Sequence, residues 1–213
     1  MKKWTVEYYC IHHLPAFERK NYLTPFFSTL EPSVNWIEDF LPDHESIINH
    51  HKVQSIHSAN GSFLNKAELS CFMKHRLAVK KISESNCDYG VVFEDDIEYP
   101  SFDWNYYVNI FADQMSKSNG DILFIGSFTG YDIRSDSPNI NVFHNKSFKS
   151  RCAHCYMLSP KVAFKLNQKL ENIIQPYDWQ INFAIDDLNL NACWSYPHIN
   201  QRTEKGQIKS LLR

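Results

Sequence analysis

The sequence lacks any long apolar run and carries almost no net charge. No stretch approaches the roughly 20 consecutive apolar residues that a membrane-spanning helix needs. The first residues, Met1 to Glu7, lack the apolar core of a secretory signal peptide. The formal net charge of −2 excludes the global basic field that is typical of nucleic-acid-binding proteins, so we expect no nucleic-acid partner.

The sequence also lacks a cysteine framework, internal repeats and low-complexity segments. Its six cysteines follow no regular spacing, which predicts reduced thiols and a cytoplasmic location. The segment Cys152–Cys155 resembles a metal-binding motif, but one such pair of cysteines without a second pair is weak evidence for a zinc site. The Pro42–Gly61 segment is rich in histidine, yet its spacing matches no metal-binding pattern.

The size of the chain predicts one domain, alone or with a small appendage. A chain of 213 residues with 43% hydrophobic residues can bury a sizeable core, so we expect a single domain over residues 1–201. Residues 202–213 carry four basic residues against one acid. This tail either touches an anionic membrane surface, which would make the protein peripheral to an inner membrane, or is a frayed end.

The most informative stretch is an apolar run that ends in three consecutive acids. Residues 89–93 favour a strand buried on both faces, and Glu94, Asp95 and Asp96 follow without a spacer. Unpaired carboxylates are too costly to bury, so they must emerge at the strand's carboxyl end, where open α/β sheets bind ligands. The fold class predicted is therefore α/β, with a mixed, mostly parallel central sheet flanked by helices.

The acidic strand end is a candidate site for a divalent cation. Glu94 and Asp96 point to the same side if strand geometry continues, so they can share one hard ion. Mn²⁺ and Mg²⁺ accept such oxygen ligands and leave positions open for a diphosphate. The alternative is an acidic turn that caps the next segment, and spacing alone favours neither.

The clearest predicted helix covers residues 65–85. Asn65 and Glu68 form a capping-box pair at its start. Glu68, Cys71 and His75 lie at i, i+3 and i+7, a stripe beside the apolar face. This stripe borders a site, or else Glu68 belongs to the cap and His75 to the helix surface.

The remaining chain alternates predicted strands and helices. Arg19, shortly after the first strand, either meets a ligand phosphate at the sheet's edge or is a solvated helix residue. The polar residues 127–150 suit a lid or acceptor loop, and the Pro42–Gly61 segment is predicted as a loop with one irregular helix. Strands are expected at 4–11, 34–37, 121–126, 151–159 and 192–196, and helices from 15 to 20 (disturbed at Pro25), 104–116, 160–172 and 177–185.

Five motifs follow one another along the chain: Ala67–His75, Phe93–Asp96, Cys155–Ser159, Pro176–Trp179 and Pro197–Gln201. Their order resembles glycosyltransferase family 25, the lipooligosaccharide-type galactosyltransferases. The chain keeps the Glu, Cys and His of a family helix motif but has Ala67 for the usual Gly, Lys74 for the usual Ser and, in another motif, Cys155 for Ala. The resemblance implies a GT-A, Rossmann-like fold, a sugar-nucleotide donor and inversion at the anomeric carbon. UDP-galactose as donor and a glycan or glycolipid acceptor are implied by the family alone.

Sugar transfer assigns roles to these residues. Asp96 is the expected metal ligand with Glu94, and His198 is preferred to His154 as the third ligand. The ion would act as a Lewis acid on the leaving diphosphate. Asp178 is the candidate general base, although it can equally serve as an N-cap. The expected donor-binding residues are Arg19, Glu68, His75, Glu94 and Asp95.

Two other functions remain open at this point. A metal-dependent phosphohydrolase or nucleotidyltransferase can use the same acidic strand end, with Asp186 and Asp187 supplying the second acidic cluster that two ions need. A glycan- or nucleotide-binding module without catalysis is the third option, and the intact Glu94, Asp96 and Asp178 argue against it.

Overall fold

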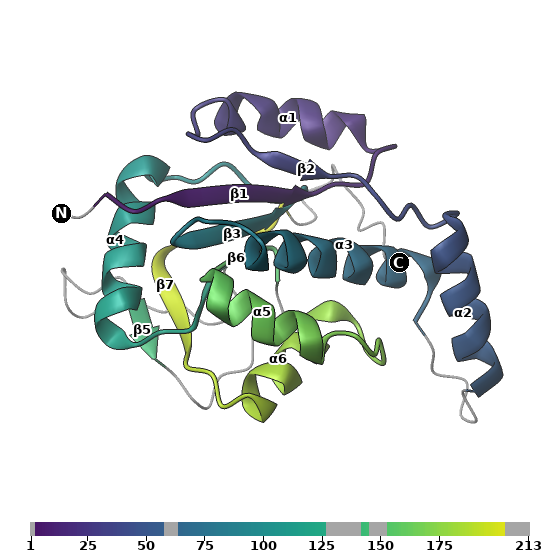
Figure 1. The fold of residues 1–213 in the computed structure, drawn as a ribbon. Helices are drawn as coiled ribbons and strands as arrows, with labels where there is room; N and C mark the ends of the chain where they lie inside the picture. The colour runs from purple at the N-terminus through teal and green to yellow at the C-terminus, as the bar shows by residue number, and fades with distance from the viewer. Residues whose placement is uncertain (1–2, 58–63, 127–141, 145–152, 203–213) are drawn as a thin grey trace.

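A computed structural model describes residues 3–57, 64–126, 142–144 and 153–202 of the chain (Figure 1). The strands of this part are β1 (Val6–Ile11), β2 (Asn35–Ile37), β3 (Tyr89–Glu94), β4 (Ile122–Gly126), β5 (Val142–His144), β6 (Cys155–Leu158) and β7 (Ala192–Ile199). The helices are α1 (Phe17–Phe27), α2 (Glu45–His57), α3 (Lys66–Ser83), α4 (Trp104–Ser118), α5 (Pro160–Lys169) and α6 (Tyr177–Asp187).

The strands form one mixed sheet in the order β2-β1-β3-β6-β4-β7-β5. β1 is parallel to both β2 and β3, and β4 is parallel to β7. β6 lies antiparallel between β3 and β4, and β5 is antiparallel to β7. Because only β5 and β6 run against the rest, the predicted mixed, mostly parallel sheet is confirmed.

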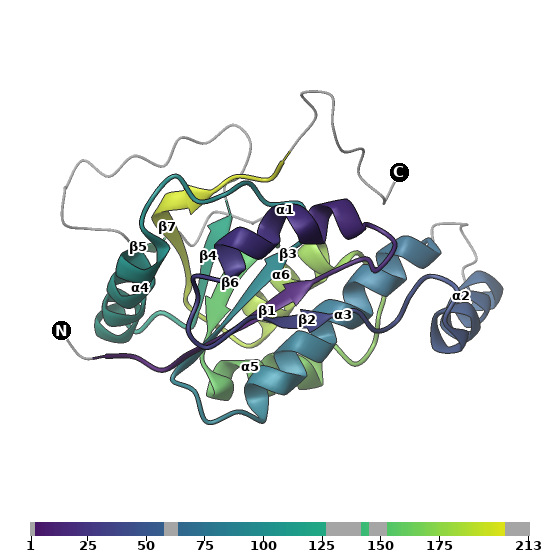
Figure 2. The ribbon, with the colours of Figure 1, turned by 90° about the horizontal axis from the view of Figure 1, so that it is seen from above.

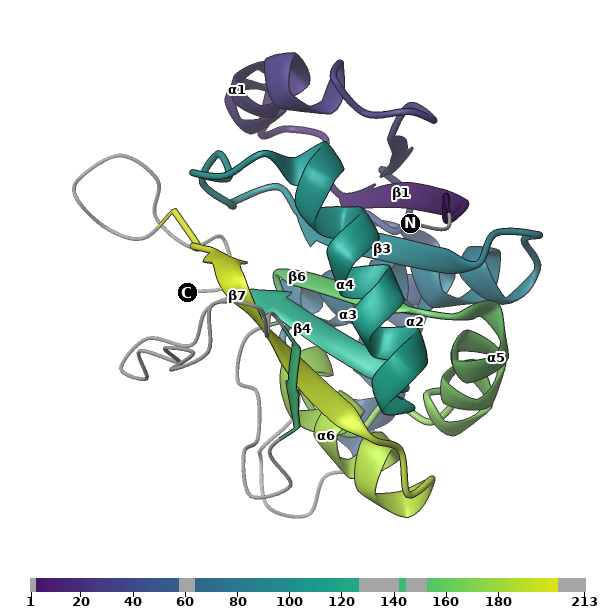
Figure 3. The same cartoon turned by 90° about the vertical axis from the view of Figure 1, so that its left-hand side faces the viewer.

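Helices cover both faces of the sheet, as alternating residues of β3 show. Val91 and Phe93 pack in a core with α1 and α4, whereas Val92 packs in a second core with α3, α5 and α6. Figure 2 shows α1 lying over the sheet, and Figure 3 shows α4 crossing in front of it. β3 is therefore buried on both sides, as its apolar run predicts.

A glycine allows α3 to lie directly on β3. A Cβ atom at Gly90 would be only 2.4 Å from the Ile82 Cγ1 atom of α3. The missing side chain therefore sets the distance between this helix and this strand. Both elements carry predicted site residues, so their close contact matters for the site.

Several local predictions are confirmed and others are corrected. The Asn65–Glu68 capping box is present at the start of α3. The histidine-rich segment forms a regular helix, α2, rather than an irregular one, and α1 continues through Pro25 without a restart. β7 extends past its predicted end at Tyr196, because Pro197 lies where the β4–β7 register shifts and no ladder donor is needed there.

Some expectations lie outside the described residues. Of the proposed lid at 127–150, only β5 is described, and residues 203–213 of the basic tail are not.

Five described cysteines are free thiols. In the described ranges, no helix combines the length and apolar character that a membrane crossing requires.

Candidate functional site

The three acids open onto a cavity of about 190 Å³ at the carboxyl end of β3. β3 ends at Glu94, and the chain turns at Asp95 and Asp96, so strand geometry does not continue through the acids. All three acids nevertheless line the cavity. The other walls come from the end of β1, from α1 and α3, and from Gln201 beyond β7.

Asp95 holds the wall of the cavity together. Its Oδ1 atom lies 2.6 Å from Arg19 Nη1, and its Oδ2 atom lies 2.8 Å from His12 Nδ1 and accepts a bond from the His13 backbone N–H at 3.0 Å. Burial alone would raise the pKa of Asp95, but the His12 bond and the Arg19 charge bring it below its ordinary value. Arg19 is buried rather than solvated, and it also lines the cavity.

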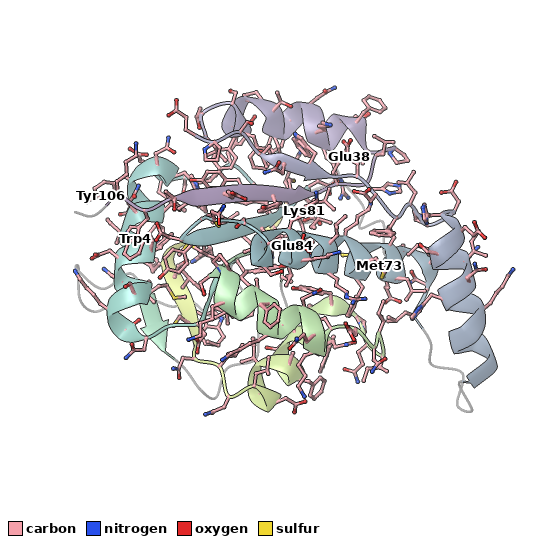
Figure 4. All side chains as sticks on the ribbon, viewed as in Figure 1. Trp4, Glu38, Met73, Lys81, Glu84 and Tyr106 are labelled. Atoms are coloured by element: carbon pink, nitrogen blue, oxygen red, sulfur yellow. The ribbon has the colours of Figure 1, made fainter. Side chains whose placement is uncertain are left out.

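The residue behind Asp95, His12, lies between two carboxylates. Glu38, which follows β2 near α1 (Figure 4), has its Oε1 atom 4.0 Å from His12 Nε2. The same Glu38 oxygen accepts a hydrogen bond from Lys20 Nζ at 2.6 Å. These polar contacts connect α1 and the end of β2 to the cavity wall.

Asp96 lines the cavity and has one buried carboxylate oxygen. Its Oδ2 atom accepts a bond of 2.9 Å from Gln201 Nε2, and its carbonyl oxygen accepts one of 2.6 Å from the Arg202 N–H. Its Oδ1 atom is buried and has no hydrogen-bond partner in the described part of the chain. Burial, and then the charge of Glu94, raise the pKa of Asp96 to about 7. A cation beside Oδ1 would give this buried oxygen a partner and would lower the pKa of Asp96.

Glu94 faces a neutral histidine. Its Oε1 atom lies 3.0 Å from His75 Nε2. Burial, and then the charges of Asp95 and Asp178, raise the pKa of Glu94 to about 8. Burial lowers the pKa of His75 to about 3, so the ring is uncharged near neutral pH.

His75 is fixed by two tyrosines. The ring is fully buried and stacks on Tyr177, with centroids 4.1 Å apart and an interplanar angle of 6°. His75 Nδ1 lies 3.2 Å from Tyr156 Oη, which is 2.9 Å from Tyr177 Oη. The donor atoms of Cys71, His75 and Glu94 all lie within 4.8 Å of one another, a geometry open to a metal ion.

The two histidines considered as third metal ligands lie on the β7 side. His198 is half-buried in β7, with its ring 6.2 Å from that of Tyr196. His154 is buried, and its Nε2 atom lies 3.1 Å from the carbonyl oxygen of Ile199. Neither belongs to the Cys71–His75–Glu94 group, the one metal-competent trio that the described residues form.

Asp178 lies in the first turn of α6, and Pro176 rather than Asp178 occupies the N-cap position. Its Oδ1 atom accepts a bond of 3.0 Å from the Trp179 N–H. Burial raises the pKa of this carboxyl above its ordinary value. The carboxylate of Glu68, by contrast, accepts the Asn65 N–H at 2.8 Å and so completes the helix cap.

Comparison with known proteins shows which family the chain belongs to. The model of glycosyltransferase family 25 (LPS biosynthesis protein) matches residues 9–187. The chain belongs to glycosyltransferase family 25. It is thus an enzyme, a glycosyltransferase of LPS biosynthesis that uses a sugar-nucleotide donor and a glycan acceptor.

Other comparisons add less to this assignment. A solved structure of CMP:2-keto-3-deoxy-manno-octonic acid synthetase complexed with CTP is similar at 9% identity and a TM-score of 0.46, covering 89% of this chain and 88% of that one. The comparison with curated proteins finds no significant match.

The family motifs meet around the cavity although they are far apart in sequence. In this family 25 glycosyltransferase, the helix motif supplies His75 and the acidic motif supplies Glu94, which face each other. The motifs of β6 and α6 supply the tyrosines that fix His75. The last motif supplies Gln201, the partner of Asp96, although it lies beyond the matched segment.

One charged residue of the cavity was not predicted from the sequence. Lys74 is 2% exposed, lines the cavity and donates a bond of 2.8 Å from Nζ to the carbonyl oxygen of His12. Burial lowers its pKa. The available signal was its place in the helix motif, where the family pattern has Ser.

The second acidic cluster required by the hydrolase alternative lies on the surface. Asp186 and Asp187 are exposed at the end of α6, and Asp187 pairs with Lys169 at 3.3 Å. The structure therefore gives this pair a surface role.

Proposed function

We propose that this family 25 enzyme transfers a hexose, with galactose favoured, from a UDP-sugar to a hydroxyl of a growing lipooligosaccharide, with inversion at the anomeric carbon. The observation that carries the proposal is the mixed charge of the cavity. Glu94 and the buried, unpartnered Oδ1 atom of Asp96 offer carboxylate oxygens to a cation, and Arg19 and Lys74 offer positive charge to a diphosphate. A sugar nucleotide with a divalent ion presents the complementary charges.

The carboxylates fit a hard divalent ion. The unpartnered Oδ1 atom of Asp96 and the raised pKa of Glu94 both mark a place where positive charge is favourable. We propose Mn²⁺ or Mg²⁺, held by Asp96 and Glu94, with His198 as third ligand and His154 as the alternative. Such an ion supplies the charge that neutralises the leaving diphosphate.

The cations of the cavity wall have a complementary role. Arg19 is held by Asp95, which fixes the guanidinium at the cavity wall. Lys74 projects into the same space from α3. We propose that both face the donor phosphates, with Asp95 acting by orienting Arg19, and that His75 and Glu68 border the donor.

Asp178 is the proposed general base. Inversion requires a base on the side of the sugar opposite the diphosphate, where it takes the proton of the acceptor hydroxyl. Its raised pKa brings a carboxylate closer to neutral pH, which favours proton acceptance. Trp179 is 45% exposed beside it and is the proposed stacking surface for the acceptor sugar.

The same proposal covers the organisation of the chain. Residues 1–201 form the catalytic domain, and the basic residues 202–213 contact the anionic inner membrane from the cytoplasmic side. The excess of basic residues in this segment and the lipid-linked nature of such acceptors support the proposal.

The experiment that tests the function measures thermal stability with UDP, GDP, CMP or ADP, each with and without Mn²⁺. UDP with Mn²⁺ at about 100 times its dissociation constant should add about 2.7 kcal/mol. Asp96→Asn should abolish this gain, and Asp113→Asn, on the surface of α4, should keep it. Stabilisation by CMP without metal, or by no nucleotide, would overturn the donor assignment.

Product analysis tests the reaction type. Transfer from UDP-galactose to an acceptor with an inverted anomeric centre is expected, and Asp178→Asn should lower its rate by about 10²–10⁴-fold while UDP binding is kept. Release of free sugar at the same rate with and without acceptor would instead favour a hydrolase.

A further inference from the structure

A second set of metal-ligating side chains lies at the inner side of the cavity. Cys71 and His75 are one turn apart on α3, and Glu94 approaches them from the end of β3. Their donor atoms all lie within 4.8 Å of one another, and His75 Nε2 is 3.0 Å from Glu94 Oε1. The set contains sulfur and nitrogen, unlike the oxygen pair of Glu94 and Asp96.

We propose that Cys71, His75 and Glu94 form a binding site for a soft divalent ion, with Zn²⁺ as the best fit. Thiolate and imidazole ligands select Zn²⁺ over Mn²⁺ and Mg²⁺. Ligands placed tetrahedrally at normal zinc distances lie roughly 3.3 to 3.6 Å apart. The separation of 3.0 Å between His75 Nε2 and Glu94 Oε1 lies just below this range, and the separations to the Cys71 sulfur do not exceed 4.8 Å, so small side-chain movements complete the site.

The surroundings of His75 orient it as a ligand. With Nε2 on the metal, Nδ1 carries the ring proton and donates a hydrogen bond to Tyr156 Oη, whose hydroxyl in turn donates a hydrogen bond to Tyr177 Oη. Stacking on Tyr177 fixes the plane of the ring. Such outer contacts are the ones that hold metal-binding histidines in position.

Charge and access both suit the ion. On binding, the Cys71 thiol releases one proton to solvent and becomes a thiolate, and Glu94, wherever it is protonated, also releases its proton to solvent and binds as a carboxylate. The two negative ligands neutralise the double positive charge, which reduces the cost of a buried site. Cys71 and Glu94 line the cavity, which gives the ion a path and leaves room for a fourth ligand.

Glu94 belongs both to this zinc site and, in the proposed function on which this step rests, to the site shared with Asp96. Zn²⁺ bound to Glu94 withdraws this carboxylate from the ion shared with Asp96. Micromolar Zn²⁺ should therefore inhibit sugar transfer even when Mn²⁺ is present in excess.

The test is a titration of the full chain with Co²⁺, the spectroscopic stand-in for Zn²⁺. Binding through Cys71 should give a thiolate-to-cobalt charge-transfer absorption that saturates at one ion per chain and disappears when Zn²⁺ is added. Cys71→Ser should remove the band. Cys87→Ser, which changes a half-buried thiol beyond the end of α3, should keep it. No band in the unaltered protein, or an equal band in Cys71→Ser, would overturn the proposal.

A second measurement does not depend on a folded variant. X-ray absorption at the zinc edge of the one-to-one complex should show one sulfur at about 2.3 Å and lighter ligands at about 2.0 Å. A shell of nitrogen and oxygen alone would contradict the assignment. Neither readout needs a nucleotide, so failure of the zinc site is distinguishable from a missing UDP response.

Discussion

At the scale of single residues, three consecutive acids have three different environments. Asp95 is fully engaged by Arg19, His12 and a backbone N–H. Its neighbours Glu94 and Asp96 instead have pKa values raised to about 8 and about 7. The carboxylate of Asp95 thus stabilises the cavity wall, whereas those of Glu94 and Asp96 are available to a cation in the cavity.

The first prediction concerns pH. In the presence of a chelator, the free energy of unfolding should fall by about 1–2 kcal/mol as the pH rises from 6.5 to 8. Each pKa unit corresponds to about 1.4 kcal/mol. Folding raises the pKa of Glu94 from 4.5 to about 8 and that of Asp96 from 3.8 to about 7, so the folded state binds more protons there. The lowered pKa values of His75 (about 3) and His154 (about 4) act oppositely, but only below their ordinary value of 6.5.

Denaturant titrations at several pH values check this prediction. Glu94→Gln should flatten the fall above pH 7, because Asp96 alone then titrates in that range. An unchanged slope in the variant would show that other groups cause the pH dependence.

The second prediction concerns the buried ion pair. Arg19→Met should lower the free energy of unfolding by about 3–5 kcal/mol, because it leaves Asp95 buried without its main partner. Arg76→Met removes a looser pair, with Arg76 Nη2 3.7 Å from Glu171 Oε1, and should cost about 0–1 kcal/mol. Equal losses in urea unfolding would contradict a special role for Arg19.

At the scale of elements, the contact between α3 and β3 controls the site. Gly90→Ala should lower stability by about 1–3 kcal/mol, because the new methyl group overlaps Ile82. Ile82→Ala removes all three of the nearest atoms, so the double variant should lose less than the sum of the single losses. Additive losses in chemical denaturation would place the strain elsewhere.

Elements with local signals could be predicted from the sequence. The β3 run and its acids were predicted, as was the start of α3, because strand patterning and a capping box depend on near neighbours. α2 was predicted poorly, since its residues Glu45–His57 carry no clear apolar periodicity. The burial of Arg19 was left open, because its partner Asp95 is 76 positions away.

At the scale of the whole molecule, the cavity joins segments that lie far apart in the chain. Its lining runs from Ile11 to Gln201, and Gln201 also bridges to Ile97 beyond the acids. No local pattern reveals such convergence, so Lys74 was not singled out and Gln201 came only from the family motif. The cavity therefore forms where the ends of β1 and β3 lie beside the segment that follows β7.

The last prediction follows from this distribution. Unfolding of the chain should be a single cooperative transition, and UDP with Mn²⁺ should shift all of it to higher denaturant, because the cavity proposed to bind them is lined by β1, β3, α1 and α3 and by Gln201 beyond β7. Tryptophan fluorescence and far-ultraviolet circular dichroism should give coincident curves. A ligand effect confined to one of two separate transitions would contradict this.

The strand order also bears on how the protein is made. β3 and β4 leave the ribosome well before β6, the strand that must enter between them. Until residue 158 has emerged, β3 and β4 each have an unpaired edge. Their apolar residues, which are buried in the folded protein, are then exposed and open to wrong pairing. The nascent chain is thus most vulnerable to aggregation while the residues between β4 and β6 are being translated, and slow translation of that stretch would lengthen the risk.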